Sequence, residues 1–205
     1  MIQILDLVRT ISLLIFLLPG KVFSAQTVEP FTSEQKEKLA AGEVVFLEPD
    51  APYLFKAAVQ IDAPAASVWA VMRDQERIPN YVKNVREIRV LEKGENWKII
   101  EQKLKLHPLL PRFNFVFKEE YGPGYSIQFE RVRGSFKDVK GWWRVDQNVP
   151  ENSVTLVYST YVDVGWFIPK SWIKKGINKD VPELLVAFRD EVYSDFEDDD
   201  NNNET

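Results

Sequence analysis

The longest amphipathic pattern in the chain lies near its C-terminus, in residues 167–194. Its apolar residues recur three, four or one positions apart, and charged residues occupy the opposite face, as in a helix that packs on a core along one stripe. Asp180 followed by Pro182 has the pattern of an N-cap with a proline in the first turn. The sequence therefore predicts a firm helix over 180–194, with 169–178 as a preceding turn or a kinked extension.

Most of the remaining chain shows the period-two alternation of half-buried strands. Clusters of Gly, Pro, Asn or Ser separate the alternating segments, and they have the chemistry of turns. Because these connections are short, we expect consecutive strands to pair antiparallel. The predicted strands are residues 43–47, 53–62, 85–93, 95–106, 111–121, 124–134, 136–147 and 153–164.

Three shorter helices are predicted in the first half of the chain. A capping box at Thr32 opens the first of them, over residues 33–41, and Gly42 ends it. Residues 65–74 form the second, with apolar side chains on one face. A further short helix is expected over 76–84.

This order of elements predicts an α+β fold. A strongly curved antiparallel sheet with bulky inner residues cannot close tightly on itself, so the long C-terminal helix has to fill its concave face. A sheet that grips a helix but stays splayed at one end leaves an apolar cavity between them. The expected architecture is a helix-grip fold, with two short helices after the strand at 53–62.

The apolar face of each strand, together with the apolar stripe of the helix, gives the expected lining of this cavity. Arg131 shares the face of Ile127 and Phe129, and it either reaches a ligand head group or lies at the end of the sheet in water. The predicted ligand-binding residues are Ile100, Leu104, Phe115, Phe117, Ile127, Phe129, Arg131, Trp143, Tyr158, Ile177, Val181 and Leu184.

A family resemblance begins in residues 59–92, VQIDAPAASVWAVMRDQERIPNYVKNVREIRVLE. These residues resemble the opening of the START-like superfamily, also called SRPBCC or Bet v-type, and within it the polyketide cyclase and coenzyme-Q-binding subgroup. The resemblance extends over about residues 39–193, and its core and turn positions are Ala63, Pro64, Val68, Trp69, Asp74, Pro79 and Val85. It implies the helix-grip fold and a pocket for a lipid, sterol, quinone or polyketide. No family motif carries a fixed catalytic residue that can be transferred to this sequence, so no catalytic position is carried over.

Candidate catalytic chemistry is sparse in this sequence. His107 is the only histidine and there is no cysteine, which excludes a His-rich or thiolate metal site and a disulfide. We expect His107 in an exposed loop, with a general base at the cavity mouth as the alternative. By alternation the strand carboxylates Glu101, Asp138 and Asp163 fall on the outer face, away from any proton transfer. The sequence thus predicts no catalytic residue, no metal site and no cofactor.

Charge narrows the range of partners. The net charge is −5, and the last eleven residues alone carry six carboxylates and no basic residue. The body of the protein therefore has no basic excess that would favour nucleic acid. Residues 195–205 are predicted to be a disordered tail. The apolar segments 107–113 and 165–168, with Trp172, are expected either to touch a membrane transiently or to pack on the core.

The N-terminus has the layout of a secretory signal peptide, predicted as residues 1–25. A short uncharged run at 11–18 follows Arg9, and small residues suited to cleavage come after it. The run is too short for an ordinary transmembrane helix. A cleaved signal is expected, and a retained anchor or a buried segment are the alternatives. The mature chain would be exported, to the periplasm or beyond, with a helix and short strand in 26–52 and the helix-grip domain in 53–194.

The functional hypothesis is the binding of a hydrophobic small molecule, such as a lipid or isoprenoid quinone, for carriage or sensing. The alternative is a cyclase or aromatase that acts on a hydrophobic substrate in the same cavity. An inward-facing ionisable residue with a strongly shifted pKa would favour the enzyme. A filled core without a cavity would favour a structural domain instead.

Overall fold

The computed structural model describes residues 30–49, 54–105, 111–147, 152–165 and 170–203. One compact unit, Phe31–Thr205, contains all of the elements. The helices are α1 (Ser33–Ala40), α2 (Ala65–Arg73), the 3-10 turn η1 (Gln75–Arg77), α3 (Ile78–Tyr81) and α4 (Lys170–Asn203). The strands are β1 (Val45–Leu47), β2 (Leu54–Ile61), β3 (Val85–Lys93), β4 (Trp97–Leu104), β5 (Phe113–Gly122), β6 (Ser126–Gly134), β7 (Asp138–Asp146) and β8 (Val154–Asp163).

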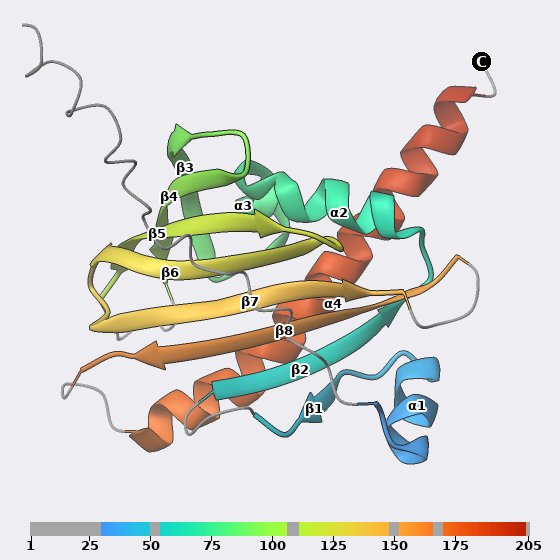
Figure 1. Cartoon of the computed structure of the whole chain (residues 1–205), viewed down its shortest axis with the longest axis horizontal. Helices are drawn as coiled ribbons and strands as arrows, with labels where there is room; N and C mark the ends of the chain where they lie inside the picture. Colours follow the sequence, from blue (N-terminus) through green and yellow to red (C-terminus); the bar gives the residue numbers. More distant parts are fainter. Residues whose placement is uncertain (1–29, 50–53, 106–110, 148–151, 166–169, 204–205) are drawn as a thin grey trace, which may run out of the picture. The chain divides into compact units, whose positions relative to one another are not determined.

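The eight strands form one antiparallel sheet in the order β1-β2-β8-β7-β6-β5-β4-β3. Consecutive strands are neighbours, as the short turns require, except that β2 pairs with β8. Irregularities in the β3–β4 and β5–β6 pairings add local twist and bend to the sheet. Helix α4 crosses one face of this sheet, and α2 and α3 lie beside it (Figure 1). The predicted helix-grip α+β fold is confirmed.

The prediction for the last helix was too short at both ends. Helix α4 begins at Lys170, so Asp180 is not its N-cap, and Pro182 lies inside the helix. Proline in a helix interior removes one hydrogen bond and costs roughly 3 kcal/mol. Burial of Val181 and Leu185 on either side of Pro182 offsets that cost through tertiary packing, which the local pattern does not show. The helix also continues to Asn203, through residues that the sequence assigned to a disordered tail.

The local sequence pattern at the start of α1 predicted its N-terminus correctly. Thr32 and Gln35 form the predicted capping box, with Thr32 Oγ1 accepting from Gln35 N at 3.2 Å and Gln35 Oε1 accepting from Thr32 N at 2.9 Å. The helix expected over 76–84 is divided into η1 and α3. Within the described part of the chain, no helix is both long and apolar enough to span a membrane. The predicted signal peptide lies outside the described residues.

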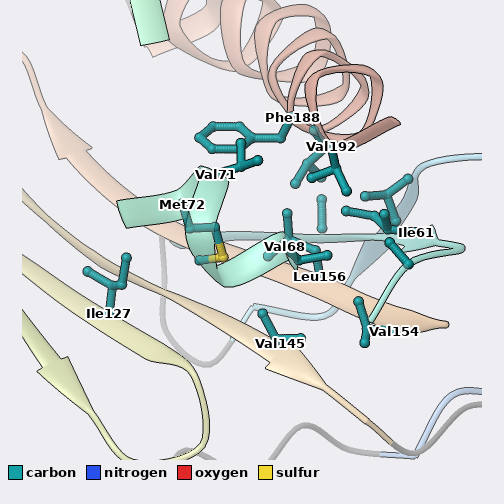
Figure 2. Close-up of a cluster of buried hydrophobic side chains, with 14 of the residues drawn as sticks. Ile61, Val68, Val71, Met72, Ile127, Val145, Val154, Leu156, Phe188 and Val192 are labelled. Atoms are coloured by element: carbon teal, nitrogen blue, oxygen red, sulfur yellow. The ribbon is translucent and has the colours of Figure 1, made fainter. Parts of the chain in front are cut away.

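Two hydrophobic clusters lie against α4. The first, here called the α2–α4 cluster, joins α2 and α4 to the sheet around β2 and β8, and Figure 2 shows its side chains converging from these elements. Its members include Ile61, Val68, Val71, Met72, Leu156, Leu185, Phe188 and Val192.

The second cluster, here called the phenylalanine cluster, lies under β3, β4 and β5. It consists of Val82, Val85, Ile88, Ile100, Phe113, Phe115, Phe117, Phe136 and Val139. Among the α4 residues whose side chains are described, the partly buried Leu184 and Ala187 pack against it. The helix therefore covers one side of the sheet closely and leaves the other side short of apolar partners.

Candidate ligand-binding cavity

A cavity of about 720 Å³ lies between α4 and the sheet. Its volume is within the range of about 300–1,000 Å³ that is typical of small-molecule sites. Along α4 the lining runs from Gly176 to Phe188, which corresponds to a length of about 18 Å at the helical rise of about 1.5 Å per residue. Most of the phenylalanine cluster borders the cavity, so its apolar side chains form the wall opposite the helix.

Ten of the twelve residues predicted from the strand faces and the helix stripe border this cavity. They are Leu104, Phe115, Phe117, Ile127, Phe129, Trp143, Tyr158, Ile177, Val181 and Leu184. Ile100 and Arg131 do not. Ile100 is fully buried in the phenylalanine cluster, and Arg131 Nη2 donates to the Gly134 carbonyl at 3.1 Å, at the end of β6. Contact of any of these residues with a ligand stays a prediction.

Aromatic rings follow one another along the sheet side of the cavity. Trp143 stacks on Tyr158 with ring centroids 4.0 Å apart, and Tyr158 lies 6.3 Å from Phe129. Phe129 in turn meets Phe117 edge to face at 6.2 Å. Gly141 leaves room for this arrangement, because a Cβ there would lie 2.4 Å from the Phe129 ring. The result is a continuous aromatic surface that suits an apolar ligand.

The three carboxylates considered from the sequence lie away from the cavity, as the alternation predicted. Glu101 accepts a hydrogen bond from Asn114 Nδ2 at 3.4 Å. Asp163 pairs with Lys137 at 3.4 Å and accepts the Gly165 N–H at 2.8 Å. None of the three, Asp138 included, borders the cavity. His107 lies outside the described residues, as do 107–110 and 166–168 of the two apolar segments.

One carboxyl that the sequence analysis missed does border the cavity. Glu119 on β5 is only 6% exposed, and Gln75 Nε2 donates to its Oε2 at 2.7 Å. The Tyr121 hydroxyl donates to the same oxygen at 3.4 Å. Burial raises the pKa of Glu119 to about 7, against the opposing effect of the Lys98 ammonium and of these two hydrogen bonds. The signal was present in the sequence, since Glu119 continues the inward alternation of Phe115 and Phe117.

A network of residues from three elements holds this carboxyl. Lys98 Nζ on β4 donates to Gln75 Oε1 at 2.6 Å and to the Arg73 carbonyl at 2.8 Å. An ammonium can only donate, so the Gln75 side-chain oxygen must face Lys98 and its NH₂ group must face Glu119. Gln75 Nε2 also lies 3.2 Å from the Met72 carbonyl oxygen and 3.2 Å from the Tyr121 hydroxyl oxygen. The orientation of Gln75, and with it the position of Glu119, is therefore fixed.

A second group of polar residues borders the cavity at the end that is farther from η1, around residues 179–180 of α4. Asn84, Gln102, Lys179 and Asp180 border the cavity there. Burial raises the pKa of Asp180, and a hydrogen bond from the Asn84 side chain opposes that shift. The cavity thus has an apolar middle with polar groups at both ends. Within the described residues, no three His, Cys, Asp or Glu side chains are grouped so that they could hold a metal ion.

The fold is similar to that of several solved structures. They include a START superfamily protein from Mycobacterium smegmatis (16% identical, TM-score 0.61, covering 69% of this chain and 97% of that chain). The Zhui aromatase/cyclase from Streptomyces sp. R1128 is 15% identical with a TM-score of 0.61, and the match covers 68% of this chain and 93% of that chain. A STAR-related lipid transfer protein from Xanthomonas axonopodis is 21% identical with a TM-score of 0.58, and the match covers 73% of this chain and 92% of that chain. At these identities the likeness concerns the fold alone. The comparison with curated proteins gave no match.

A match at the level of the sequence family goes further than the fold. The family model described as polyketide cyclase/dehydrase and lipid transport matches residues 61–189, which reach from the end of β2 to the part of α4 that borders the cavity. The START-like resemblance inferred from residues 59–92 is thereby confirmed. The chain belongs to the polyketide cyclase/dehydrase and lipid transport family.

Proposed function

We propose that this protein binds a hydrophobic small molecule, such as a lipid or an isoprenoid compound, in the cavity under α4 and carries or senses it. The observation that carries this proposal is the cavity itself, with its volume of about 720 Å³ and its wall of aromatic and aliphatic side chains. Transfer of apolar groups into such a space is favourable by about 0.8 kcal/mol per methylene. A chain of about ten methylenes would therefore gain several kcal/mol before the costs of association and ordering are subtracted.

Native mass spectrometry of the protein purified from its own host tests this function. The expected result is a co-purified apolar molecule, or binding of one member of a lipid panel. The variant Leu184→Trp places a large ring on the cavity wall and should abolish binding, whereas Leu91→Trp makes the same change at an exposed position of β3. A folded wild-type protein that shows only its own mass and binds no lipid would contradict the proposal.

The second candidate function is that of a cyclase or aromatase, and Glu119 is the observation that favours it. An ionisable group on the cavity wall with a pKa near 7 is suited to general acid and base chemistry. In an aldol-type ring closure its carboxylate would take a proton from a carbon beside a carbonyl, and the new carbon–carbon bond would form. The neutral carboxyl would then return the proton to the alkoxide oxygen.

This alternative is tested with a thioester-linked polyketone chain as substrate and mass spectrometry of the products. The enzyme hypothesis expects a cyclised product from the wild type and almost none from Glu119→Gln, which keeps the shape but cannot accept the proton. The same product yield from both proteins, or from buffer alone, would rule it out. The similarity of the fold to that of the Zhui aromatase/cyclase supports a test for cyclisation.

Export of the protein, and transient contact with a membrane through residues 107–113, are further parts of the proposal. N-terminal sequencing of the protein isolated from its host tests the first, with a mature end near residue 25 as the expected result. Co-sedimentation with phospholipid vesicles tests the second.

A further inference from the structure

Binding of a purely apolar molecule leaves Glu119 unexplained. A carboxyl group on the wall of an apolar cavity loses most of its hydration, and an apolar side chain at the same position would avoid that cost. The hydrogen bonds from Gln75 and Tyr121 hold the group in place but do not require it to face a cavity. A ligand that itself bears a polar group would explain why the carboxyl is there.

The hydrogen-bond geometry shows which of its oxygen atoms is available to a ligand. Two hydrogen-bond donors are described for Glu119, and both donate to Oε2. They are Gln75 Nε2 and the Tyr121 hydroxyl. In the neutral acid the proton therefore resides on Oε1, because Oε2 already serves as the acceptor of two donors. Neutral Glu119 is then an O–H donor at the cavity wall.

The surrounding charges narrow the chemistry of a partner group. Lys98 on β4 is the cation that acts on Glu119, while Arg73, Asp74 and Glu76 act on Lys98 in turn. An ammonium group on the ligand would be placed near Lys98, which carries the same charge. A hydroxyl group can donate or accept, so it would bind either charge state of Glu119 and would not need the proton that burial favours. A carbonyl oxygen carries no charge and needs only a donor, and neutral Glu119 supplies it.

We propose that Glu119 is the polar anchor of the cavity and that the ligand is a hydrophobic molecule with a carbonyl group at one end, which accepts a hydrogen bond from the neutral carboxyl of Glu119. This inference rests on the proposed function of binding a hydrophobic molecule. It adds the class of ligand and the orientation of the ligand. The carbonyl lies beside η1 and β5, and the apolar chain extends along α4 toward Gly176.

The test uses two probes of equal length, methyl undecyl ketone and tridecane, titrated into the full-length protein by calorimetry. The wild type should bind the ketone about tenfold more tightly at a pH of about 5.5 than at about 8.5, on either side of the pKa of about 7. The affinity for tridecane should not change in this way, because the alkane accepts no hydrogen bond.

Two variants separate hydrogen bonding from ionisation. Glu119→Gln offers an N–H donor at every pH, so it should bind the ketone with little pH dependence. Glu119→Met is apolar and of similar length, so its affinity for the ketone should fall to that for the alkane. Circular dichroism verifies that both variants are folded. The carbon-13 chemical shift of the carbonyl in labelled ketone gives a second readout of the hydrogen bond. On binding, this shift should change in the wild type at low pH and in Glu119→Gln, but not in Glu119→Met.

The outcomes distinguish this inference from the function on which it rests. If both probes bind the wild type and Glu119→Met equally, with the same pH dependence, the cavity takes hydrophobic molecules but Glu119 is not its anchor. If neither probe binds the folded wild type, the proposed function fails and the anchor fails with it.

Discussion

The two hydrophobic clusters beside α4 differ in how closely the helix packs against them. In the α2–α4 cluster the helix inserts Leu185 and Val192, both at most 1% exposed, among side chains of α2, β2 and β8. In the phenylalanine cluster the rings of Phe115 and Phe117 face the cavity, and the residues that the described part of the helix contributes are only partly buried. The same helix thus holds the fold together on one side and leaves room for a ligand on the other.

The largest effect on stability is expected at Leu185, and the adjacent Leu184, which borders the cavity and packs against both clusters, is its comparison. Leu185→Ala removes a fully buried side chain from the α2–α4 cluster and should lower the free energy of unfolding by about 2–5 kcal/mol. Leu184→Ala removes a partly buried side chain that already faces open space, so we expect a loss of about 1 kcal/mol or less. Urea denaturation measures both, and equal losses would show that the cavity side is packed as tightly as the core.

The second prediction concerns stability and pH on the cavity side. Burial raises the pKa of Glu119 from its ordinary value of 4.5 to about 7, so the folded state binds this proton more tightly than the unfolded state does. The wild type should therefore lose stability from this group as pH rises from about 4.5 to about 7, by about 3 kcal/mol in all. Glu119→Gln should not show this pH-dependent loss of stability, because glutamine does not titrate.

Denaturation of the wild type and of Glu119→Gln at several pH values measures this difference. The variant should gain on the wild type by about 3 kcal/mol between pH of about 4 and about 8, and most of the gain should come between the two pKa values. A constant difference between the two proteins across this range would mean that Glu119 is as well solvated in the folded state as in the unfolded chain.

The smallest effect on stability is expected at the contact between the α3 region and α4. Arg77 Nη2 lies 2.7 Å from Asp195 Oδ1 and 2.5 Å from Glu191 Oε1, and the Arg77 side chain is 42% exposed. Because partly exposed ion pairs contribute little, Arg77→Met should lower the free energy of unfolding by about 1 kcal/mol or less.

The effect of Arg77→Met on ligand exchange should be larger than its effect on stability. Ile78, next to Arg77, and Val82, just after α3, border the cavity, so loosening this segment from α4 should speed the release of methyl undecyl ketone. Stopped-flow dilution of the loaded protein measures the release rate. Lys38→Met, at an exposed ion pair on α1, is the matched control and should leave the rate unchanged. Equal release rates in all three proteins would place the exit route elsewhere.

The candidate site was predictable where it depends on the alternation of side chains between the two faces of a strand. Alternation placed Phe115 and Phe117 on the cavity wall, and the same rule extends to Glu119 two residues further on. The prediction failed where the outcome depends on contacts between distant elements. Nothing in the local pattern shows that Gln75 and Lys98, which lie on different elements, meet Glu119, or that packing on both sides of Pro182 keeps α4 continuous.

The order and type of the elements, the antiparallel pairing and the inner face of each strand were determined by the sequence alone, because they depend on alternation and turn residues within a few positions of each other. The open space between α4 and the phenylalanine cluster was decided only by the tertiary structure, as was the raised pKa of Glu119. A cavity depends on how far apart two packed elements come to rest, and the pKa of a buried carboxyl depends on the water it loses there. Both quantities arise from the whole domain and are not encoded in any one segment.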